Sequence, residues 1–450
     1  MQRRGLSAFD IGCVVIGGIV GVGIFFTPQK VAAAVDDGTQ VVVAWSLGGL
    51  IAVLGALVFA RLARAMPEHG GTFFWIAQKL GPLPAFLYGW ANWLVIQAGA
   101  LGVIGIVFAE NLDVALHGTK GMSDGAKVGL ASAAIGTFTV LNACGIRTGS
   151  RVQNALVVVK LVAIFGIVAL AVFVGGGSGD VAAAPTTTAA AAPRAPVGWV
   201  AAMAAAMLPV LFACGGWQQG SFVAGAARQP ARDVPLGILG GVAVVVVTYM
   251  AVNLAFLELL GFDGAARSTT IGADAARVGL APLGHGDLAA RLLAGLIATS
   301  ALGIVNTICL APPFVLHAMS KQGLFPRSLG ALHPRTGTPV LGVIVQGGQG
   351  IVLLLLLWLL FGGRAKDVLD FLLDGVVFVD WVFYALAGVA ALRLPASRAN
   401  VVAIAFTLAS AVVCVGAIAV TPLASLSGLA VCALGVPVYL LRRRDLPAVG

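Results

Sequence analysis

Long apolar segments recur along the whole of this 450-residue chain and limit what it can fold into. A helix that crosses a bilayer needs about 20 mostly apolar residues. Lipid offers no hydrogen-bond partners to the backbone, so a spanning segment must be a helix or part of a closed barrel. The segments lack the alternation of apolar and polar residues that barrel strands require. We therefore predict an all-α integral membrane protein with twelve transmembrane helices, at approximately residues 8–34, 39–64, 83–109, 127–144, 151–175, 197–227, 234–260, 288–319, 338–361, 367–393, 399–419 and 422–441.

The basic residues are distributed unequally between the loops on the two sides of these segments. With a cytoplasmic N-terminus, 17 of the 27 Lys and Arg residues fall on the cytoplasmic side, as the positive-inside rule requires. We therefore expect a multi-pass protein of the cell (inner) membrane with both termini in the cytoplasm. The net charge of +9 reflects this distribution. It does not indicate nucleic-acid binding, which would need a basic face on a soluble domain.

The composition also argues against catalysis. Hydrophobic residues make up 59% of the chain and charged residues 10%, which leaves no soluble domain of any size. The six cysteines lie in or at the ends of apolar segments, without the close spacing of a metal site. The chain has no phosphate-binding loop and no nucleophile elbow. We expect no enzymatic activity, no cofactor, no metal and no cleavable signal peptide.

The first apolar segment carries a cluster of glycines in the stretch "VIGGIVGVGIFFTP", residues 15–28. Glycine inside a helix costs about 1 kcal/mol relative to alanine, so this helix is weakest at its own midpoint. The alternative is that Gly17, Gly18 and Gly21 only permit close packing between helices. Because Gly21 and Gly23 are followed by a proline, we predict that the helix unwinds there.

A second interrupted segment, "LPVLFACGGWQQGSFVAG" at residues 208–225, has Gly215 and Gly216 at its middle. If the chain consists of two five-helix halves, the first and sixth segments open those halves. Glycine- or proline-interrupted segments at corresponding positions point to the binding site of a transporter. The N-terminus of a half-helix suits a carboxylate, and unwound carbonyls suit an ammonium group or a cation.

Several stretches together resemble the amino acid–polyamine–organocation transporter superfamily, and its L-type amino acid transporter branch in particular. The resemblance covers nearly all of residues 7–395, in order. It implies the leucine-transporter fold, with a 5+5 inverted repeat plus two C-terminal helices. The repeats would be residues 1–176 and 197–395, with an external low-complexity loop at 177–196 and the last two helices and a cytoplasmic tail at 396–450. The stretches are "GGIVGVGIFFTP", "MPEHGGTFFWIAQKLGPLPAFLYGWANW", "SRVQNALVVVKLVAIF", "LFACGGWQQGSFVAGAARQPARDVPLGI" and "IVNTICLAPPFVLHAMSKQGLFP".

The resemblance also implies a substrate site made largely of backbone groups. The substrate carboxylate would meet the N–H groups around Val22, Gly23 and Ile24. Phe212 corresponds to the aromatic gate that closes over the substrate from outside; without the resemblance, a core or lipid-facing phenylalanine is the favoured interpretation. The small residues Cys214 and Gly215 suggest either a roomier pocket or weaker aromatic packing, and Val22 replaces a usual serine. The carbonyl groups expected around the substrate ammonium are those of Ile19, Val20, Phe212, Ala213 and Cys214.

Three positions depart from the charged residues usual in this family near the cytoplasmic face. Arg61 stands where an acid is usual in the second helix. Ala226 replaces an acid after the sixth helix, and Phe314 replaces an arginine in the eighth. We interpret these as linked losses of one charge network.

Two ionisable residues lie inside apolar segments. Lys160 stands ten residues into the fifth segment, or about 15 Å deep at 1.5 Å per residue, which is too deep for easy snorkelling. The resemblance puts it where sodium-coupled relatives hold a sodium ion. Its ammonium would bind unwound carbonyls near Gly17 and Gly18 and could gain and lose a proton during transport. Asp380, in the middle of the tenth segment, is the second candidate for proton or ion coupling, with a structural hydrogen bond as the alternative.

These features predict a secondary-active transporter of small neutral or hydrophobic amino acids that works by alternating access, proton-coupled or as an exchanger. The alternatives are a sodium-coupled symporter of amino acids or amines, and an amino acid sensor that does not transport. A channel would need a more polar pore lining than these segments supply. Human members of the L-type branch join a glycoprotein partner through a cysteine in the external loop after the third helix. Residues 110–127 contain no cysteine, so the resemblance implies no disulfide-linked heavy chain, and we expect a monomer or weak homodimer.

Overall fold

The computed structural model describes residues 5–118, 121–175, 198–268, 270–280, 285–420 and 422–443. These residues form helices and connecting turns, and within them the only β-type pairing is an isolated parallel bridge between Leu6 and Ala227. The predicted external loop at 177–196 and the last residues of the predicted tail lie outside the described residues.

The elements up to residue 175 follow the predicted apolar segments, with the first one divided into pieces. They are α1 (Ala8–Ile19), the 3₁₀ turn η1 (Val22–Phe25), α2 (Thr27–Ala34), α3 (Gly38–Ala65), α4 (Thr72–Leu80), α5 (Pro82–Ala91), the π-helical η2 (Asn92–Gln97), α6 (Ala98–His117), α7 (Asp124–Ala143) and α8 (Ile146–Gly175).

The elements after residue 198 begin with a second divided segment. They are α9 (Trp199–Cys214), α10 (Gln219–Phe222), the 3₁₀ turn η3 (Ala224–Ala226), α11 (Pro230–Arg267), α12 (Ile271–Leu280), α13 (Gly286–Leu310), α14 (Pro313–Lys321), α15 (Arg327–Gly330), α16 (Val340–Leu360), α17 (Ala365–Leu392), α18 (Ala399–Val420) and α19 (Pro422–Arg443).

Nine helices in the described part of the chain are long and apolar enough to cross a membrane. Three shorter apolar helices, Ala8–Ile19, Phe378–Leu392 and Ser425–Leu441, lie in three further predicted segments. The prediction of an all-α, multi-pass membrane protein is confirmed. The first of the short helices starts at a capping box, in which Ser7 and Asp10 satisfy each other's backbone N–H groups.

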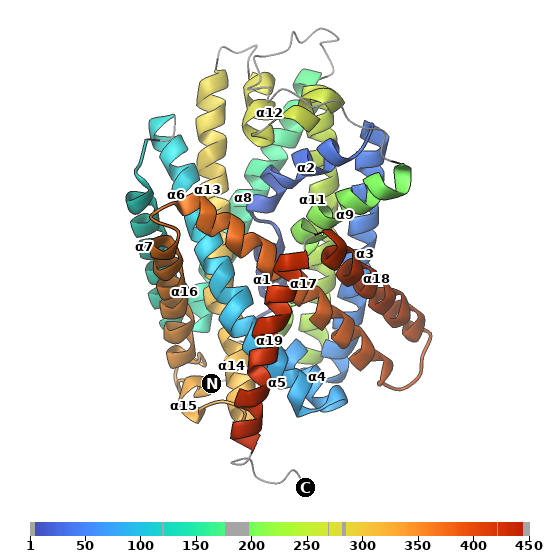
Figure 1. Cartoon of the computed structure of the whole chain (residues 1–450), viewed down its shortest axis with the longest axis vertical. Coiled ribbons are helices and arrows are strands. Elements are labelled where there is room, and N and C mark those ends of the chain that lie inside the picture. Colours follow the sequence, from blue (N-terminus) through green and yellow to red (C-terminus); the bar gives the residue numbers. More distant parts are fainter. Residues whose placement is uncertain are drawn as a thin grey trace.

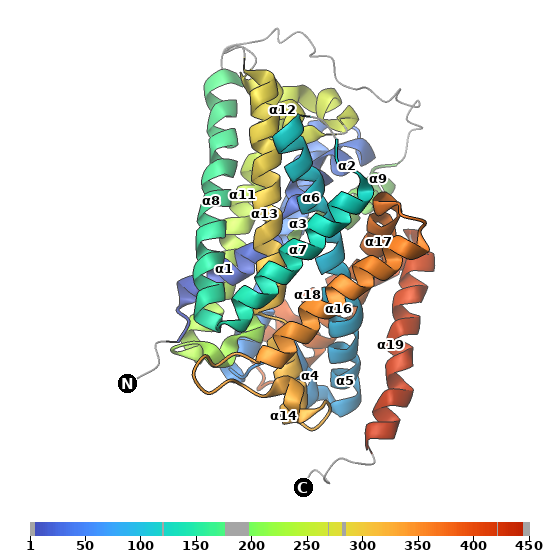
Figure 2. The ribbon, with the colours of Figure 1, turned by 90° about the vertical axis from the view of Figure 1, so that its left-hand side faces the viewer.

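The helices pack around two hydrophobic clusters. The larger cluster joins α1, α3, α9, α11 and α17, and the smaller one joins α6, α7, α13 and α16. In Figure 1, α2 and α12 lie at one end of the bundle and α4 and α14 at the other. We call these the α12 end and the α14 end. Figure 2 shows α19 along the outside of the bundle.

The spaced Ala and Val residues of the external stretch 258–287 predict a short surface helix, and the structure corrects this in one respect. The helix exists as α12, but most of its residues are buried, including Ile271, Ala275 and Ala276. Its small residues let it pack closely, because a Cβ on Gly272 would lie 3.2 Å from Phe25. The α12 helix therefore packs over the part of the first broken segment that contains Phe25, instead of lying on the surface.

Candidate functional site

The first apolar segment is broken between α1 and η1. The α1 helix ends at Ile19, Val20 is extended (φ −73°, ψ 95°) and Gly21 has φ −130° and ψ −149°. A Cβ on Gly21 would lie 2.0 Å from Cδ1 of Ile304, so a larger residue at this point would require the Ile304 side chain to move. The start of η1, with Val22, Gly23 and Ile24, presents backbone N–H groups that a helix leaves without internal partners.

The sixth apolar segment is broken between α9 and α10, and this break lies directly against the first one. The α9 helix ends at Cys214, and Gly216 has φ +123°, a conformation that side-chain-bearing residues rarely adopt. A Cβ on Gly216 would lie 2.6 Å from the Gly18 carbonyl oxygen. The two breaks are therefore in backbone contact, and glycine permits both the conformation and the approach.

A tyrosine on α11 joins the two breaks. The Tyr249 hydroxyl lies 2.8 Å from the Ile19 carbonyl oxygen and 3.1 Å from that of Ala213, and Tyr249 is buried. These are two of the carbonyl groups expected around a substrate ammonium. Sequence reasoning missed Tyr249. The only signal in the sequence was the hydroxyl group of a tyrosine inside an otherwise apolar segment. Such a signal does not reveal a partner 230 residues away.

The buried Lys160 on α8 reaches the same break from another side. Its Nζ donates to the Val20 carbonyl oxygen at 2.6 Å and, at 3.4 Å, to that of Ser300 on α13. The side chain is 0% exposed, so it does not reach the membrane surface. The ammonium group was expected to bind carbonyl groups near Gly17 and Gly18. It binds that of the unwound residue Val20, less than one helical turn further along the chain.

Phe212 lies on the last turn of α9, facing the first break. Its ring centroid is 6.2 Å from that of Phe26, with a tilt of 43°, and a Cβ on Gly23 would touch its ring edge at 3.9 Å. The Phe212 ring therefore faces the protein interior and not the lipid. Phe26, its partner, was not anticipated from the sequence.

An aromatic cluster surrounds the second break. Trp217 stacks on Tyr384 of α17 with 4.8 Å between ring centroids, and the Tyr384 hydroxyl lies 2.5 Å from Gln218 Oε1. Asp380 lies one turn from Tyr384 on the same helix and is partly exposed. The conformation of Gly215 and Gly216 is thus held by rings and one side-chain hydrogen bond.

Backbone hydrogen bonds join two chain segments at the α14 end. Leu6 N–H donates to the Ala226 carbonyl at 2.9 Å, and Arg228 N–H donates to the Leu6 carbonyl at 2.8 Å. The Arg228 side chain adds a bond from Nε to the Gly5 carbonyl at 2.9 Å. The segment before α1 is thereby tied to the segment after α10, so the two broken helices are linked at this end as well as at their breaks.

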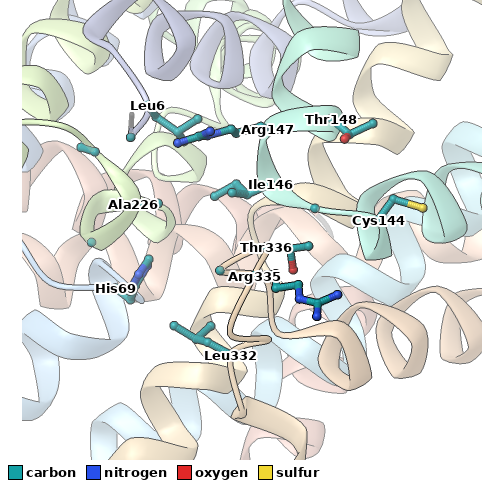
Figure 3. Close-up of a pocket in the computed structure, with 15 residues that line it drawn as sticks. Leu6, His69, Cys144, Ile146, Arg147, Thr148, Ala226, Leu332, Arg335 and Thr336 are labelled. Atoms are coloured by element: carbon teal, nitrogen blue, oxygen red, sulfur yellow. The ribbon is translucent and has the colours of Figure 1, made fainter. Parts of the chain in front are cut away.

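A cavity of about 480 Å³ opens beside this backbone bridge. Its walls come from the N-terminal segment, the α3–α4 and α7–α8 turns, η3 and the loop before α16. In Figure 3, Arg147 extends toward Leu6, and His69 lies near Ala226. Burial lowers the pKa of His69, in the turn before α4, to about 4.

The three positions that depart from the family pattern do not form one cluster. Phe314 stacks on His69 with ring centroids 4.7 Å apart, and His69 lies against Gly225, next to Ala226. Arg61 instead donates to Asn400 Oδ1 at 2.8 Å and to the Pro395 carbonyl at 2.9 Å. The interpretation as losses from a single charge network therefore fits Ala226 and Phe314, which both lie near His69. Arg61 lies elsewhere and connects α3 to the start of α18 by hydrogen bonds.

Comparison with known proteins assigns the chain to a family. A family model described as amino acid permease matches residues 6–437. The chain belongs to this amino acid permease family. The match includes both broken segments, Lys160 and Tyr249.

The permease is also similar to individual transporters over most of its length. It is 26% identical to the b(0,+)-type amino acid transporter 1 of Mus musculus over 375 residues, covering 83% of the permease and 72% of that protein. It is 27% identical to the serine/threonine exchanger SteT of Bacillus subtilis (83% and 79% covered). It is 28% identical to the methylthioribose transporter of the same species (78% and 75% covered).

Proposed function

We propose that this permease is a secondary-active transporter that moves small neutral or hydrophobic amino acids across the cell membrane by alternating access. The observation that carries the proposal is the contact between the two broken helices. Their unwound backbones meet at Gly18 and Gly216, and Tyr249 bridges carbonyl groups of both. The family and the named transport functions of the relatives support it.

The substrate would be held by backbone groups at both ends of its charged head. The N–H groups of Val22, Gly23 and Ile24 would bind the carboxylate, where the partial positive charge of a helix start favours an anion. The ammonium group would bind carbonyl oxygens near the breaks. Each carbonyl oxygen has two lone pairs, so those of Ile19 and Ala213 can accept a substrate proton beside Tyr249. The remaining proposed substrate contacts are Val20, Phe212, Cys214 and Gly215.

Lys160 is our principal candidate for the coupling group. Its ammonium occupies the position of a bound cation, at 2.6 Å from the unwound Val20 carbonyl. Releasing a proton would remove the charge that strengthens this hydrogen bond, so the protonation state of Lys160 and the shape of the first break would change together. This arrangement supports proton coupling or exchange, with Asp380 as the second coupling candidate. Sodium symport is the alternative, and the lysine ammonium argues against it.

Alternating access would open the permease at one end at a time. Phe212 against Phe26 would be the gate at the α12 end, and the Leu6–Ala226 bridge would close the α14 end. We propose that the α14 end is cytoplasmic, because most basic loop residues belong there. The full architecture would be two inverted five-helix repeats, residues 1–176 and 197–395, followed by two more helices, which makes twelve spanning helices. The working unit would be a monomer or weak homodimer without a disulfide-linked heavy chain.

The decisive experiment is uptake into proteoliposomes with a panel of competing amino acids, with and without pH and sodium gradients. Saturable uptake that neutral amino acids inhibit, driven by a pH gradient or by internal amino acid, is the expected result. Uptake that requires a sodium gradient would establish the alternative coupling. Binding without flux would identify a sensor, and conductive flow that does not saturate would identify a channel.

A further inference from the structure

Gly17 forms a notch on α1 that is filled by side chains of two other helices. A Cβ on Gly17 would lie 1.6 Å from Gln153 Nε2 on α8 and 2.8 Å from Thr307 Oγ1 on α13. Gln153 Nε2 also donates to the Cys13 carbonyl oxygen, one turn earlier on α1, at 3.4 Å. The α1 helix lies against both α8 and α13 (Figure 2). The missing side chain at Gly17 therefore admits a buried amide to the surface of α1.

Two further amides hold Gln153 in this notch. Asn306 on α13 donates to Gln153 Oε1 at 2.7 Å, and Asn142 on α7 donates to Asn306 Oδ1 at 2.8 Å. Asn306 also donates to the Gly149 carbonyl oxygen of α8 at 3.1 Å. The three amide residues are at most 1% exposed. We call them the amide chain, because each donates to the next and the last donates to α1.

The bonds within the amide chain are stronger than its bond to α1. The two bonds between its side chains have ordinary lengths, whereas the 3.4 Å from Gln153 Nε2 to the Cys13 oxygen exceeds the usual range of about 2.7–3.2 Å. A carbonyl inside a helix also accepts the N–H group four residues later. If α1 moved away, the amide chain would keep its own bonds and the Cys13 carbonyl would keep its helical bond. The contact can therefore break and form again at low cost.

The α1 helix is built as a separate piece that could move in this way. It is 12 residues long, and the unwound Val20 and Gly21 separate it from η1. We propose that Gln153 is a latch: it positions α1 while the α14 end is closed and releases α1 when the permease opens there. This proposal rests on the alternating access proposed above. Asn142 and Asn306 would act through Gln153, by keeping its amide aimed at the notch.

The test uses the native thiols of the full-length permease in detergent. Cys13 on α1 and Cys309 on α13 are 3% and 0% exposed, so N-ethylmaleimide reaches each of them only when its surroundings open. The readout is the ratio of the Cys13 to the Cys309 alkylation rate, measured by mass spectrometry. A general loosening of the fold would raise both rates, whereas release of α1 raises that of Cys13 alone.

Gln153→Ala should raise this ratio about three- to tenfold, because the loss of one hydrogen bond changes an equilibrium by roughly this factor. Gln153→Met fills the notch without the hydrogen bonds and should give a smaller rise, and it keeps the test valid if Gln153→Ala does not fold. The matched control is Gln346→Ala, which shortens a buried glutamine on α16 and should leave the ratio unchanged.

A double variant separates the latch from simple packing. Gly17→Ala places a methyl group in the notch and displaces the Gln153 amide, so it should also raise the ratio. In Gly17→Ala/Gln153→Ala the methyl group meets no amide, and the ratio should stay near that of Gln153→Ala alone. Independent effects of the two substitutions would instead multiply.

An unchanged ratio in Gln153→Ala, or multiplied effects in the double variant, would overturn the proposal. So would an equal rise in Gln346→Ala. The failure of the proposed function would look different, because wild-type permease that transports no amino acid would refute that function, whereas the thiol ratio reports whether Gln153 holds α1 without any substrate.

Discussion

The two broken helices are built from similar glycine-rich stretches but are held open by different chemistry. At the first break, polar groups from other helices bind the free carbonyls: Lys160 at Val20 and Tyr249 at Ile19. At the second, aromatic rings and a positive-φ glycine hold the chain, with Trp217 stacked on Tyr384. Hydrogen bonds can be exchanged for bonds to a substrate, whereas ring stacking and the close backbone approach at Gly216 cannot. The first break is therefore suited to change during transport and the second to remain fixed.

The largest effect is expected at the polar contact of the first break. Lys160→Met leaves the Val20 carbonyl without its charged donor, and a hydrogen bond to a charged group contributes about 1.5–3 kcal/mol. We expect initial rates of amino acid uptake in proteoliposomes to fall about 10- to 100-fold. Lys127→Met is the control, because this buried lysine on α7 pairs with Asp124, away from both breaks. Wild-type rates and pH dependence in Lys160→Met would show that the first break does not need the lysine.

A substitution at the second break should act on stability as well as on transport. Gly216→Ala adds a Cβ 2.6 Å from the Gly18 oxygen at φ +123°, and backbone strain of this kind costs about 1–3 kcal/mol. We expect a lower melting temperature in detergent and strongly reduced uptake. In Gly240→Ala, the Cβ meets no atom within 4 Å, so this variant should melt at or above the wild-type temperature. If both variants melt alike, the second break is less rigid than its geometry indicates.

A smaller effect is expected at Tyr249, whose hydroxyl contacts carbonyl groups of both breaks. Tyr249→Phe removes a hydroxyl that two carbonyl groups share, and a hydrogen bond contributes about 1 kcal/mol. The half-saturation concentration for alanine should therefore rise about 3- to 10-fold. Tyr439→Phe, on α19, should bind alanine as the wild type does. Tighter alanine binding in Tyr249→Phe would mean that the tyrosine competes with the substrate ammonium instead of positioning its acceptors.

The smallest effect on transport is expected beyond the second break, at the α14 end. The pKa of His69 is about 4 in the folded protein and about 6.5 when unfolded. The unfolded chain therefore binds more protons between these values, and stability is lost as the pH falls from about 6.5 toward 4. His69→Phe keeps the stacking on Phe314 and removes this contribution, which is on the order of 1–3 kcal/mol. Its melting temperature should fall less than that of the wild type on acidification, and parallel curves would contradict this.

The sequence predicted those features that are visible within one segment. Glycines inside an apolar helix are locally costly, so both interruptions lie in the stretches that the glycine clusters indicated. A charge deep in an apolar segment is equally visible, as with Lys160. Tyr249 and Phe26 were missed because an aromatic residue in an apolar segment is ordinary, and its partners lie far away in the sequence. The burial of α12 was missed because small residues suit both a surface and a tightly packed interface.

The bridge between Leu6 and Ala226 consists of peptide groups, which carry no net charge and are present whatever the side chains are. Its strength is accordingly independent of ionic strength and tolerant of sequence change on either side, unlike a pair of oppositely charged residues. The peptide part of this contact therefore survives changes of side chain, as long as neither Leu6 nor Arg228 becomes a proline and Gly5, whose Cβ would lie 2.6 Å from the Ala226 oxygen, stays small.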